Sequence, residues 1–106
     1  MDYEITPAEL KQKLESAEAP VLLDVREPVE LQMARIEGVM HIPMGELPLR
    51  AQELDAQQHI VVICHHGVRS LNVTHWLRQQ GFDKVQSMRG GIDRWSGEVD
   101  SKVPTY

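Results

Sequence analysis

The sequence predicts an α/β fold with a central, mainly parallel β-sheet flanked by α-helices on both faces. Short apolar runs recur along the chain, and segments with helical spacing separate them. Two of these runs, VLLDV and HIVVI, are apolar at nearly every position, which is typical of strands covered on both faces. Helices between successive strands supply the crossovers that parallel strands need. Charged residues, histidines and the cysteine follow the ends of several strands, at 24–27, 41–43, 64–69 and 88–91. We expect these segments at one edge of the sheet, where α/β proteins bind ligands.

The first predicted helix spans residues 7–17. Thr6, Pro7 and Glu9 form a capping-box pattern, with the threonine as N-cap and proline in the first helical position. The next elements follow in order: a strand at 21–25, a short helix at 28–36, a strand at 39–42 and a weaker helical segment at 45–55.

The clearest strand covers residues 59–63, where β-branched residues dominate. Ser70 is predicted to be the N-cap of a helix over 71–80, and Gly81 the residue just beyond its end. The last two elements are a strand at 84–88 and a turn over 90–95 that enters a short helix.

Length and composition are those of an ordinary globular protein, and residues 1–106 are expected to form a single domain. The net charge of −5 argues against nucleic acid or an anionic membrane as the main partner. The first ten residues lack the basic and apolar regions of a signal peptide, and no apolar stretch approaches the length of a membrane span. One cysteine cannot form an internal disulfide, so a cytoplasmic location is expected.

The only cysteine, Cys64, lies in the stretch VVICHHGVRS at 61–70. A thiol becomes nucleophilic as a thiolate, which forms where positive potential stabilises it. The loop leads into the N-terminus of a helix, Gly67 allows backbone amides to turn inward, and Arg69 adds a permanent cation. These features predict a cradle for an anion at, or bonded to, the cysteine sulfur. The alternative is a buried and inert cysteine that only fills the core.

Motifs along nearly the whole chain resemble the rhodanese-like domain family, in its single-domain thiosulfate sulfurtransferase form. With the Cys-x-x-Gly-x-Arg-Ser loop, the matching pieces are LLDVREPVE at 22–30, ARIEGVMHIPM at 34–44, LRQQGFDKVQSMRGGIDRW at 77–95 and VP at 103–104. The resemblance implies a rhodanese-like α/β fold and sulfur transfer. In that reaction Cys64 takes a sulfane sulfur from a donor such as thiosulfate and holds it as a persulfide. It then passes the sulfur to a thiophilic acceptor such as cyanide or a thiol.

The resemblance carries the catalytic cysteine over to Cys64, and it implies no metal and no organic cofactor. Asp24 follows a buried run, where a carboxylate needs a partner, so we expect it to pair with Arg26, Arg69 or loop amides and to support this edge. Arg26 is expected near the mouth of the crevice. The persulfide-binding loop carries over to His65, His66, Gly67, Val68, Arg69 and Ser70.

Several other functions stay open. The chain could be a persulfide carrier or regulatory module that acts with a protein partner, such as a protein sulfur acceptor. Phosphatases and arsenate reductases also cradle an anion beside a thiolate, but their chemistry fits the spacing Cys-x5-Arg. Here four residues separate Cys64 from Arg69, and a shorter loop has room for one added sulfur more readily than for a phosphoryl group.

A metal site at Cys64, His65 and His66 is a further alternative. Neighbouring residues on an extended chain point in opposite directions, which argues against a shared ion. The two histidines are therefore expected either to line the loop or to face solvent.

Overall fold

A five-stranded parallel β-sheet forms the centre of the molecule. The structure is a computed structural model that describes residues 1–106. All strand pairs are parallel, and the strand order is β1-β5-β4-β2-β3, so the predicted central sheet is confirmed. The strands are β1 (Glu4–Ile5), β2 (Val21–Asp24), β3 (Met40–His41), β4 (Ile60–Ile63) and β5 (Val85–Met88).

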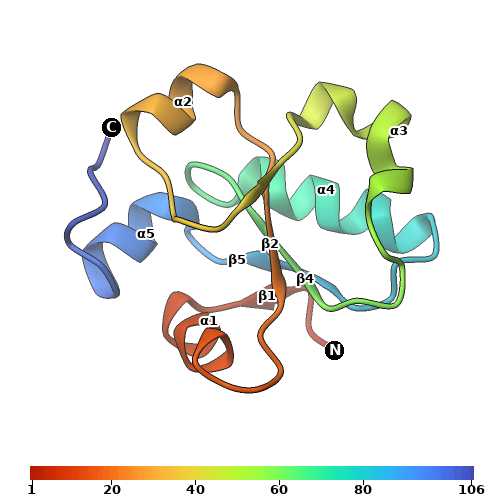
Figure 1. The fold of residues 1–106 in the computed structure, drawn as a ribbon, viewed down its shortest axis with the longest axis horizontal. Coiled ribbons are helices and arrows are strands. Elements are labelled where there is room, and N and C mark those ends of the chain that lie inside the picture. Colours follow the sequence, from red (N-terminus) through yellow and green to blue (C-terminus); the bar gives the residue numbers. More distant parts are fainter.

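Helices cover both faces of this sheet, as predicted. Figure 1 shows α1 and α5 together on one side of the strands, and α3 and α4 together on the other. No helix is long and apolar enough to cross a membrane. The helices are α1 (Pro7–Leu14), α2 (Pro28–Met33), α3 (Leu47–Arg50), α4 (Val68–Gln79) and α5 (Gly91–Glu98), with the 3-10 turns η1 (Met44–Glu46) and η2 (Ala51–Glu53) on either side of α3.

Each face of the sheet has its own apolar cluster, because side chains alternate between the faces along a strand. In β4, Val61 and Ile63 belong to the cluster that packs against α1 and α5. Val62 and the following Cys64 belong to the cluster that packs against α3 and α4. The cysteine therefore lies in the layer between the sheet and α4.

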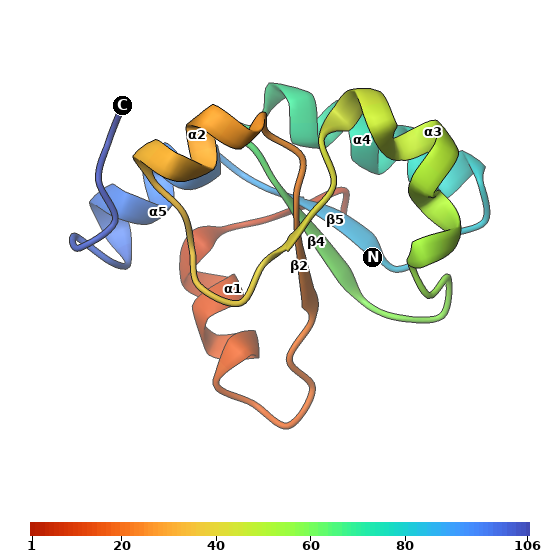
Figure 2. The same ribbon diagram turned by 45° about the horizontal axis from the view of Figure 1, so that its top comes forward.

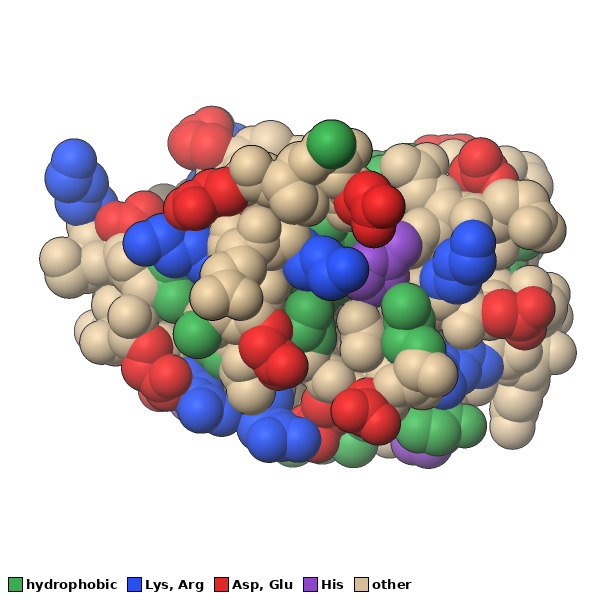
Figure 3. Space-filling view, turned by 90° about the horizontal axis from the view of Figure 1, so that it is seen from below, with side chains coloured by type: hydrophobic (Ala, Val, Ile, Leu, Met, Phe, Trp, Pro, Cys, Tyr) green, Lys and Arg blue, Asp and Glu red, His purple; other side chains and the backbone are tan.

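The carboxyl ends of the parallel strands share one edge of the sheet. Figures 1 and 2 place α2 and the start of α4 over this edge. Figure 3 views the opposite side of the molecule, where acidic and basic side chains are interspersed. The loops that follow the strands therefore lie together at the edge beneath α2 and the start of α4.

The helix predicted at 28–36 ends early, at Met33. Ala34 is extended (φ −162°), and its carbonyl accepts a hydrogen bond of 2.8 Å from Nη2 of Arg26. Arg26, from the loop just before the helix, thus binds the extended residue that follows it.

The other differences from the predicted elements are local. The capping box of α1 is confirmed, but the helix ends at Leu14, where Ser16 bonds to the carbonyl of Lys13 and competes with further helical turns. The segment at 45–55 forms α3 between two 3-10 turns, with Pro48 in the first turn of α3. Strand β1 was not predicted, since it is only two residues long.

Candidate active site

Cys64 follows β4 directly, and its side chain is buried with 1% of its surface exposed. Its Sγ accepts hydrogen bonds from the backbone amides of Gly67, at 3.0 Å, and Ser70, at 3.3 Å. The Cys64 thiol in turn donates to the hydroxyl of Ser70, at 3.2 Å. Two amides thus converge on one buried sulfur atom, an arrangement that stabilises a negative charge there. Once the thiol has lost its proton, the Ser70 hydroxyl is available as a third donor.

This sulfur also takes part in starting α4. The helix begins at Val68 with Gly67 as N-cap, so the prediction that Ser70 caps a helix over 71–80 was wrong. Gly67 adopts a left-handed conformation (φ +102°) and offers no side chain to accept the free amides of the first turn. The sulfur of Cys64 accepts the amide of Ser70, the third helical residue, as a capping side chain would.

The start of α5 binds the other side of the loop. The amide of Ile92 donates to the carbonyl of Cys64 at 2.9 Å, and that of Asp93 donates to the carbonyl of His65 at 3.2 Å. Gly91 makes this approach feasible, because a Cβ there would lie 2.3 Å from the His65 carbonyl oxygen. With its carbonyls bound by α5, the loop turns amides toward the sulfur.

Arg69 lies on the first turn of α4, but its guanidinium binds Glu30 of α2. Its two Nη atoms each lie 2.8 Å from a different carboxylate oxygen of Glu30. The hydroxyl of Tyr106 also donates to Glu30, at 2.9 Å. The bonds from Arg69 are the main reason that the pKa of Glu30 is lowered to about 2. The predicted cation is therefore near the loop, with an acidic partner that the sequence did not indicate.

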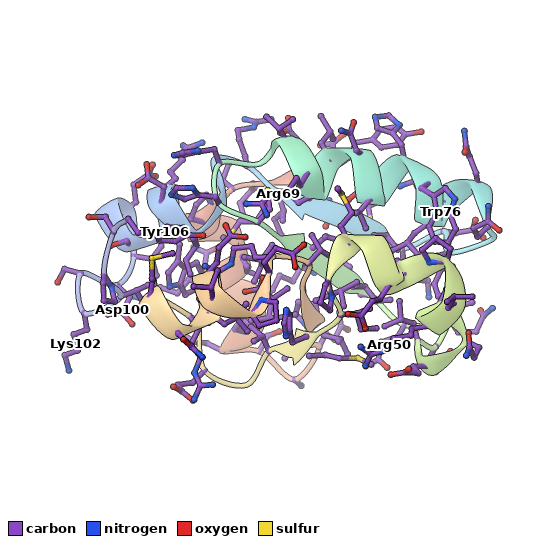
Figure 4. The ribbon with its side chains drawn as sticks, turned by 90° about the horizontal axis from the view of Figure 1, so that it is seen from above. Arg50, Arg69, Trp76, Asp100, Lys102 and Tyr106 are labelled. Atoms are coloured by element: carbon purple, nitrogen blue, oxygen red, sulfur yellow. The ribbon has the colours of Figure 1, made fainter.

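Figure 4 looks down on this edge and shows Arg69 and Tyr106 on the same side of it, with Trp76 and Arg50 farther away. Tyr106 lies in the last segment of the chain, beyond α5. Its ring stacks on that of His65, with centroids 3.8 Å apart and planes within 5°. The C-terminal segment therefore covers one side of the loop.

Asp24 and Arg26 form a fully buried ion pair behind the loop, with 2.8 Å between Nη2 and Oδ2. Arg26 was expected near the mouth of the crevice, and that expectation was wrong. It is buried because its guanidinium also donates to the carbonyls of Glu30 and Ala34 and to the hydroxyl of Tyr106. Of the partners expected for Asp24, the structure shows Arg26, which ties the end of β2 to α2 and to the C-terminal segment.

His65 and His66 lie face to face, with ring centroids 3.8 Å apart. The argument that adjacent histidines point apart was therefore wrong, because the loop is not extended. Asp93 completes a group whose potential ligand atoms lie within 4.8 Å of one another. Stacked rings direct their lone pairs side by side, whereas ligands of one ion must converge on a point. This arrangement is thus a poor fit to a shared metal ion.

Exposed apolar side chains surround this edge. Val68, at the start of α4, is 70% exposed. Four further exposed residues lie on segments that follow the carboxyl ends of β2 and β3: Val29, Met33, Met44 and Leu49. The predicted loop residues thus divide into two groups, since Ser70 faces the sulfur from inside and Val68 faces solvent.

Comparison with known proteins agrees with this geometry. The family model described as "Rhodanese-like domain" matches residues 6–98. The chain belongs to the rhodanese-like domain family. A crystal structure of a rhodanese-related protein from Thermoplasma volcanium has a TM-score of 0.84 and 34% sequence identity, covering 92% of this chain and 94% of that one. The rhodanese-like fold expected from the sequence is thereby confirmed.

Two relatives from Bacillus subtilis bear names that refer to sulfur. The putative sulfurtransferase YtwF is 41% identical over 99 residues, which cover 93% of this rhodanese-like domain and 95% of YtwF. The putative sulfur carrier protein YrkF is 42% identical over 97 residues, or 92% of this chain. The match spans 52% of YrkF, so this chain corresponds to about half of that protein.

Three residues of this rhodanese-like domain were missed in the sequence. Glu30 was read as part of a helix and of the motif LLDVREPVE, without a role of its own, and Tyr106 was not singled out, although both contact the loop or Arg69. Ser87 was taken as part of a buried strand, yet its Oγ lies 2.7 Å from that of Ser70. A polar residue inside a buried strand was the one available indication of that contact.

Proposed function

We propose that this chain is a thiosulfate-type sulfurtransferase that carries sulfur as a persulfide on Cys64. The observation that carries the proposal is the set of amides from Gly67 and Ser70 that donate to the buried sulfur, at 3.0 and 3.3 Å. Donors fixed in advance stabilise an anion without reorganising during the reaction. Rhodanese-like relatives named for sulfur transfer or sulfur carriage support the same chemistry.

The proposed reaction has two displacements. The Cys64 thiolate attacks the outer sulfur of thiosulfate, the S–S bond of the donor breaks, and sulfite leaves with the electron pair. The enzyme is then a persulfide anion, Cys–S–S⁻. Cyanide or a thiolate attacks its outer sulfur, which regenerates the Cys64 thiolate and releases thiocyanate or a new persulfide. Covalent catalysis of this kind predicts ping-pong kinetics.

In this scheme Arg69 helps to bind the anionic donor near the loop. Its guanidinium has five N–H donors, and the two bonds to Glu30 leave others free. No metal or organic cofactor is needed, because the loop amides and helix N-terminus hold the negative charge. A single free thiol suits a reducing compartment, so we place the activity in the cytoplasm, with residues 1–106 acting as one domain.

A protein could also be the sulfur acceptor. The five exposed apolar residues around the site form the kind of surface that a protein partner covers. They are Val29, Met33, Met44, Leu49 and Val68. The name of YrkF, a putative sulfur carrier protein, points the same way. In this second form of the function, the persulfide would pass to a cysteine of a protein instead of to cyanide.

Intact mass spectrometry tests the first displacement directly. After incubation with thiosulfate, the protein is expected to gain the mass of one sulfur atom, and cyanide or a thiol should remove it. Cys64→Ser should gain nothing. A gain of the same mass in Cys64→Ser, or no gain in the wild-type protein, would contradict the proposal.

A second variant separates donor binding from folding. Arg69→Ala is expected to slow sulfur loading from thiosulfate about tenfold or more, since an anionic donor loses a charged hydrogen-bond partner. Arg69→Ala also breaks the pair with Glu30, so Glu30→Gln, which breaks that pair but keeps the guanidinium, is the control. If Glu30→Gln slows loading as much as Arg69→Ala does, Arg69 is structural and not part of donor binding.

A further inference from the structure

Ser87 is a fully buried hydroxyl in a layer that is mostly apolar. It lies on β5 paired with Val62 of β4, so its side chain shares the layer between the sheet and α4 with Cys64. Burying a hydroxyl is unfavourable unless it is hydrogen-bonded. The one hydrogen bond of this side chain joins it to the hydroxyl of Ser70, at 2.7 Å.

The direction of that bond follows from what each hydroxyl can reach. The hydrogen of Ser87 has a single acceptor, the Oγ of Ser70. While the cysteine is a neutral thiol, it donates to the Oγ of Ser70, 3.2 Å away. Once the thiol has ionised and Ser87 donates to Ser70, the hydrogen of Ser70 is free for the sulfur. In the reverse direction the Ser87 hydrogen would be buried without an acceptor, which costs free energy. The forward chain runs from Ser87 through Ser70 to the sulfur.

We propose that Ser87 is a positioning residue, which aims the Ser70 hydroxyl at Cys64 and so favours the thiolate over the neutral thiol. Hydrogen bonds in a chain polarise one another, so a Ser70 hydroxyl that accepts from Ser87 is the stronger donor to the sulfur. The same donor remains available to a persulfide anion. The inference shares the reactive cysteine with the proposed function, but it does not depend on sulfur transfer.

Without Ser87, the Ser70 hydroxyl loses the donor that directs its hydrogen toward the sulfur. Ser70 is the third residue of α4, so the residue four positions earlier, His66, lies outside the helix and provides no helical carbonyl for it. The neighbours of the Ser70 Oγ are the sulfur of Cys64 and the Oγ of Ser87. Removing the Ser87 hydroxyl leaves the Cys64 thiol as the remaining donor to Ser70, which favours the neutral thiol.

The test is the pH dependence of Cys64 alkylation by iodoacetamide, followed by intact mass. The chain has one cysteine, so every adduct reports on it, and Cys64→Ser is the blank. In Ser87→Ala the midpoint of the rate profile should move about one pH unit upward, which is roughly a tenfold slower reaction below the midpoint. Ser87→Thr keeps the hydroxyl and should restore the wild-type profile. Thiolate absorbance in the ultraviolet gives a second readout.

Two controls separate positioning from stability. Thr74→Val also removes a buried hydroxyl from this layer, and it should lower the melting temperature without moving the profile. On a Ser70→Ala background, Ser87→Ala should cause no further shift, because Ser87 acts through Ser70. An unchanged profile in Ser87→Ala, an equal shift in Thr74→Val, or a full shift on the Ser70→Ala background would overturn the proposal. A wild-type protein that takes no sulfur from thiosulfate yet shows these shifts would reject the proposed function and keep this inference.

Discussion

Glu30 of α2 holds Arg69 of α4 by two hydrogen bonds of 2.8 Å, one from each Nη atom. The side chains are 14% and 32% exposed, so the pair is partly protected from water. Two parallel bonds between a guanidinium and a carboxylate are stronger than a single surface contact. The pair joins the segments that follow β2 and β4, and so braces the Cys64 loop from outside.

Stability at acid pH should depend on this pair. The pKa of Glu30 falls from 4.5 to about 2, chiefly through the bonds from Arg69, so the folded state holds the charged form more tightly than the unfolded state. The contribution of the charged Glu30 to the free energy of unfolding is complete above about pH 4.5 and is lost as the pH falls toward about 2. We expect Glu30→Gln to cost roughly 2 kcal/mol at neutral pH, with the partial exposure of Arg69 already discounted. Urea unfolding of both proteins measures this. The difference in free energy of unfolding between Glu30→Gln and the wild-type protein should shrink as the pH falls through this range.

Glu53→Gln is the matched control for that experiment. Glu53 also binds an arginine, Arg50, at 2.8 Å, but its side chain is 41% exposed. Exposed pairs contribute about 0–1 kcal/mol, so the control should change little at any pH. If the two variants behave alike, the Glu30–Arg69 pair is an ordinary surface contact.

The buried pair of Asp24 and Arg26 should be far more sensitive. Both side chains are fully buried, and removing one partner leaves an uncompensated charge in the core. Asp24→Asn and Arg26→Met are each expected to lower the free energy of unfolding by roughly 3–5 kcal/mol. Arg50→Ala, which breaks an exposed pair, should cost less than about 1 kcal/mol. Chemical denaturation measures all three, and equal losses would contradict the role given to burial.

Much of the fold was predictable because local patterns specify it. Continuous apolar runs indicated β2 and β4, and proline and glycine marked where neighbouring segments stop. Cys64 was expected at the end of a strand and beside a helix start, which is where it lies. These inferences needed only residues that are close in the sequence, so no knowledge of distant contacts was required.

The partners of the loop were not predictable, since they come from distant segments. Glu30 lies 39 residues before Arg69 and 76 before Tyr106. Arg26 has one distant partner as well, since its Nη1 donates to Tyr106, 80 residues later, while its other acceptors lie within eight residues. The start of α4 was misplaced for a different reason, because the sulfur of Cys64 takes the part that a capping hydroxyl was expected to take.

Gly91 should tolerate no side chain. A Cβ there would meet the His65 carbonyl oxygen at 2.3 Å, and its φ of +64° is unfavourable for other residues. We expect Gly91→Ala to destabilise the fold by about 2 kcal/mol or more and to slow alkylation or sulfur loading of Cys64. Gly97→Ala, in the same helix and with open space around its Cβ, should be neutral or stabilise by up to about 1 kcal/mol. Melting temperature and intact mass distinguish the two variants.

Tyr106 joins two parts of the site, and two substitutions separate them. Its hydroxyl accepts from Nη1 of Arg26 at 2.8 Å and donates to Glu30 at 2.9 Å, while its ring stacks on His65. Tyr106→Phe removes the hydroxyl alone and leaves a buried guanidinium short of an acceptor. It is expected to cost about 1–3 kcal/mol in urea unfolding. The His65 ring should stay covered, with its NMR resonances little changed.

Tyr106→Ala removes the ring as well, so the resonances of His65 should move toward those of an exposed histidine, and the loss of stability should be larger. Tyr3→Phe is the control at the other tyrosine. Tyr3 is 44% exposed and stacks on His75, away from the loop. Its substitution should stay within about 0.5 kcal/mol of wild type. If Tyr106→Phe is as mild as Tyr3→Phe, the C-terminal segment covers the loop without bracing it, and the bonds to Arg26 and Glu30 contribute no net stability.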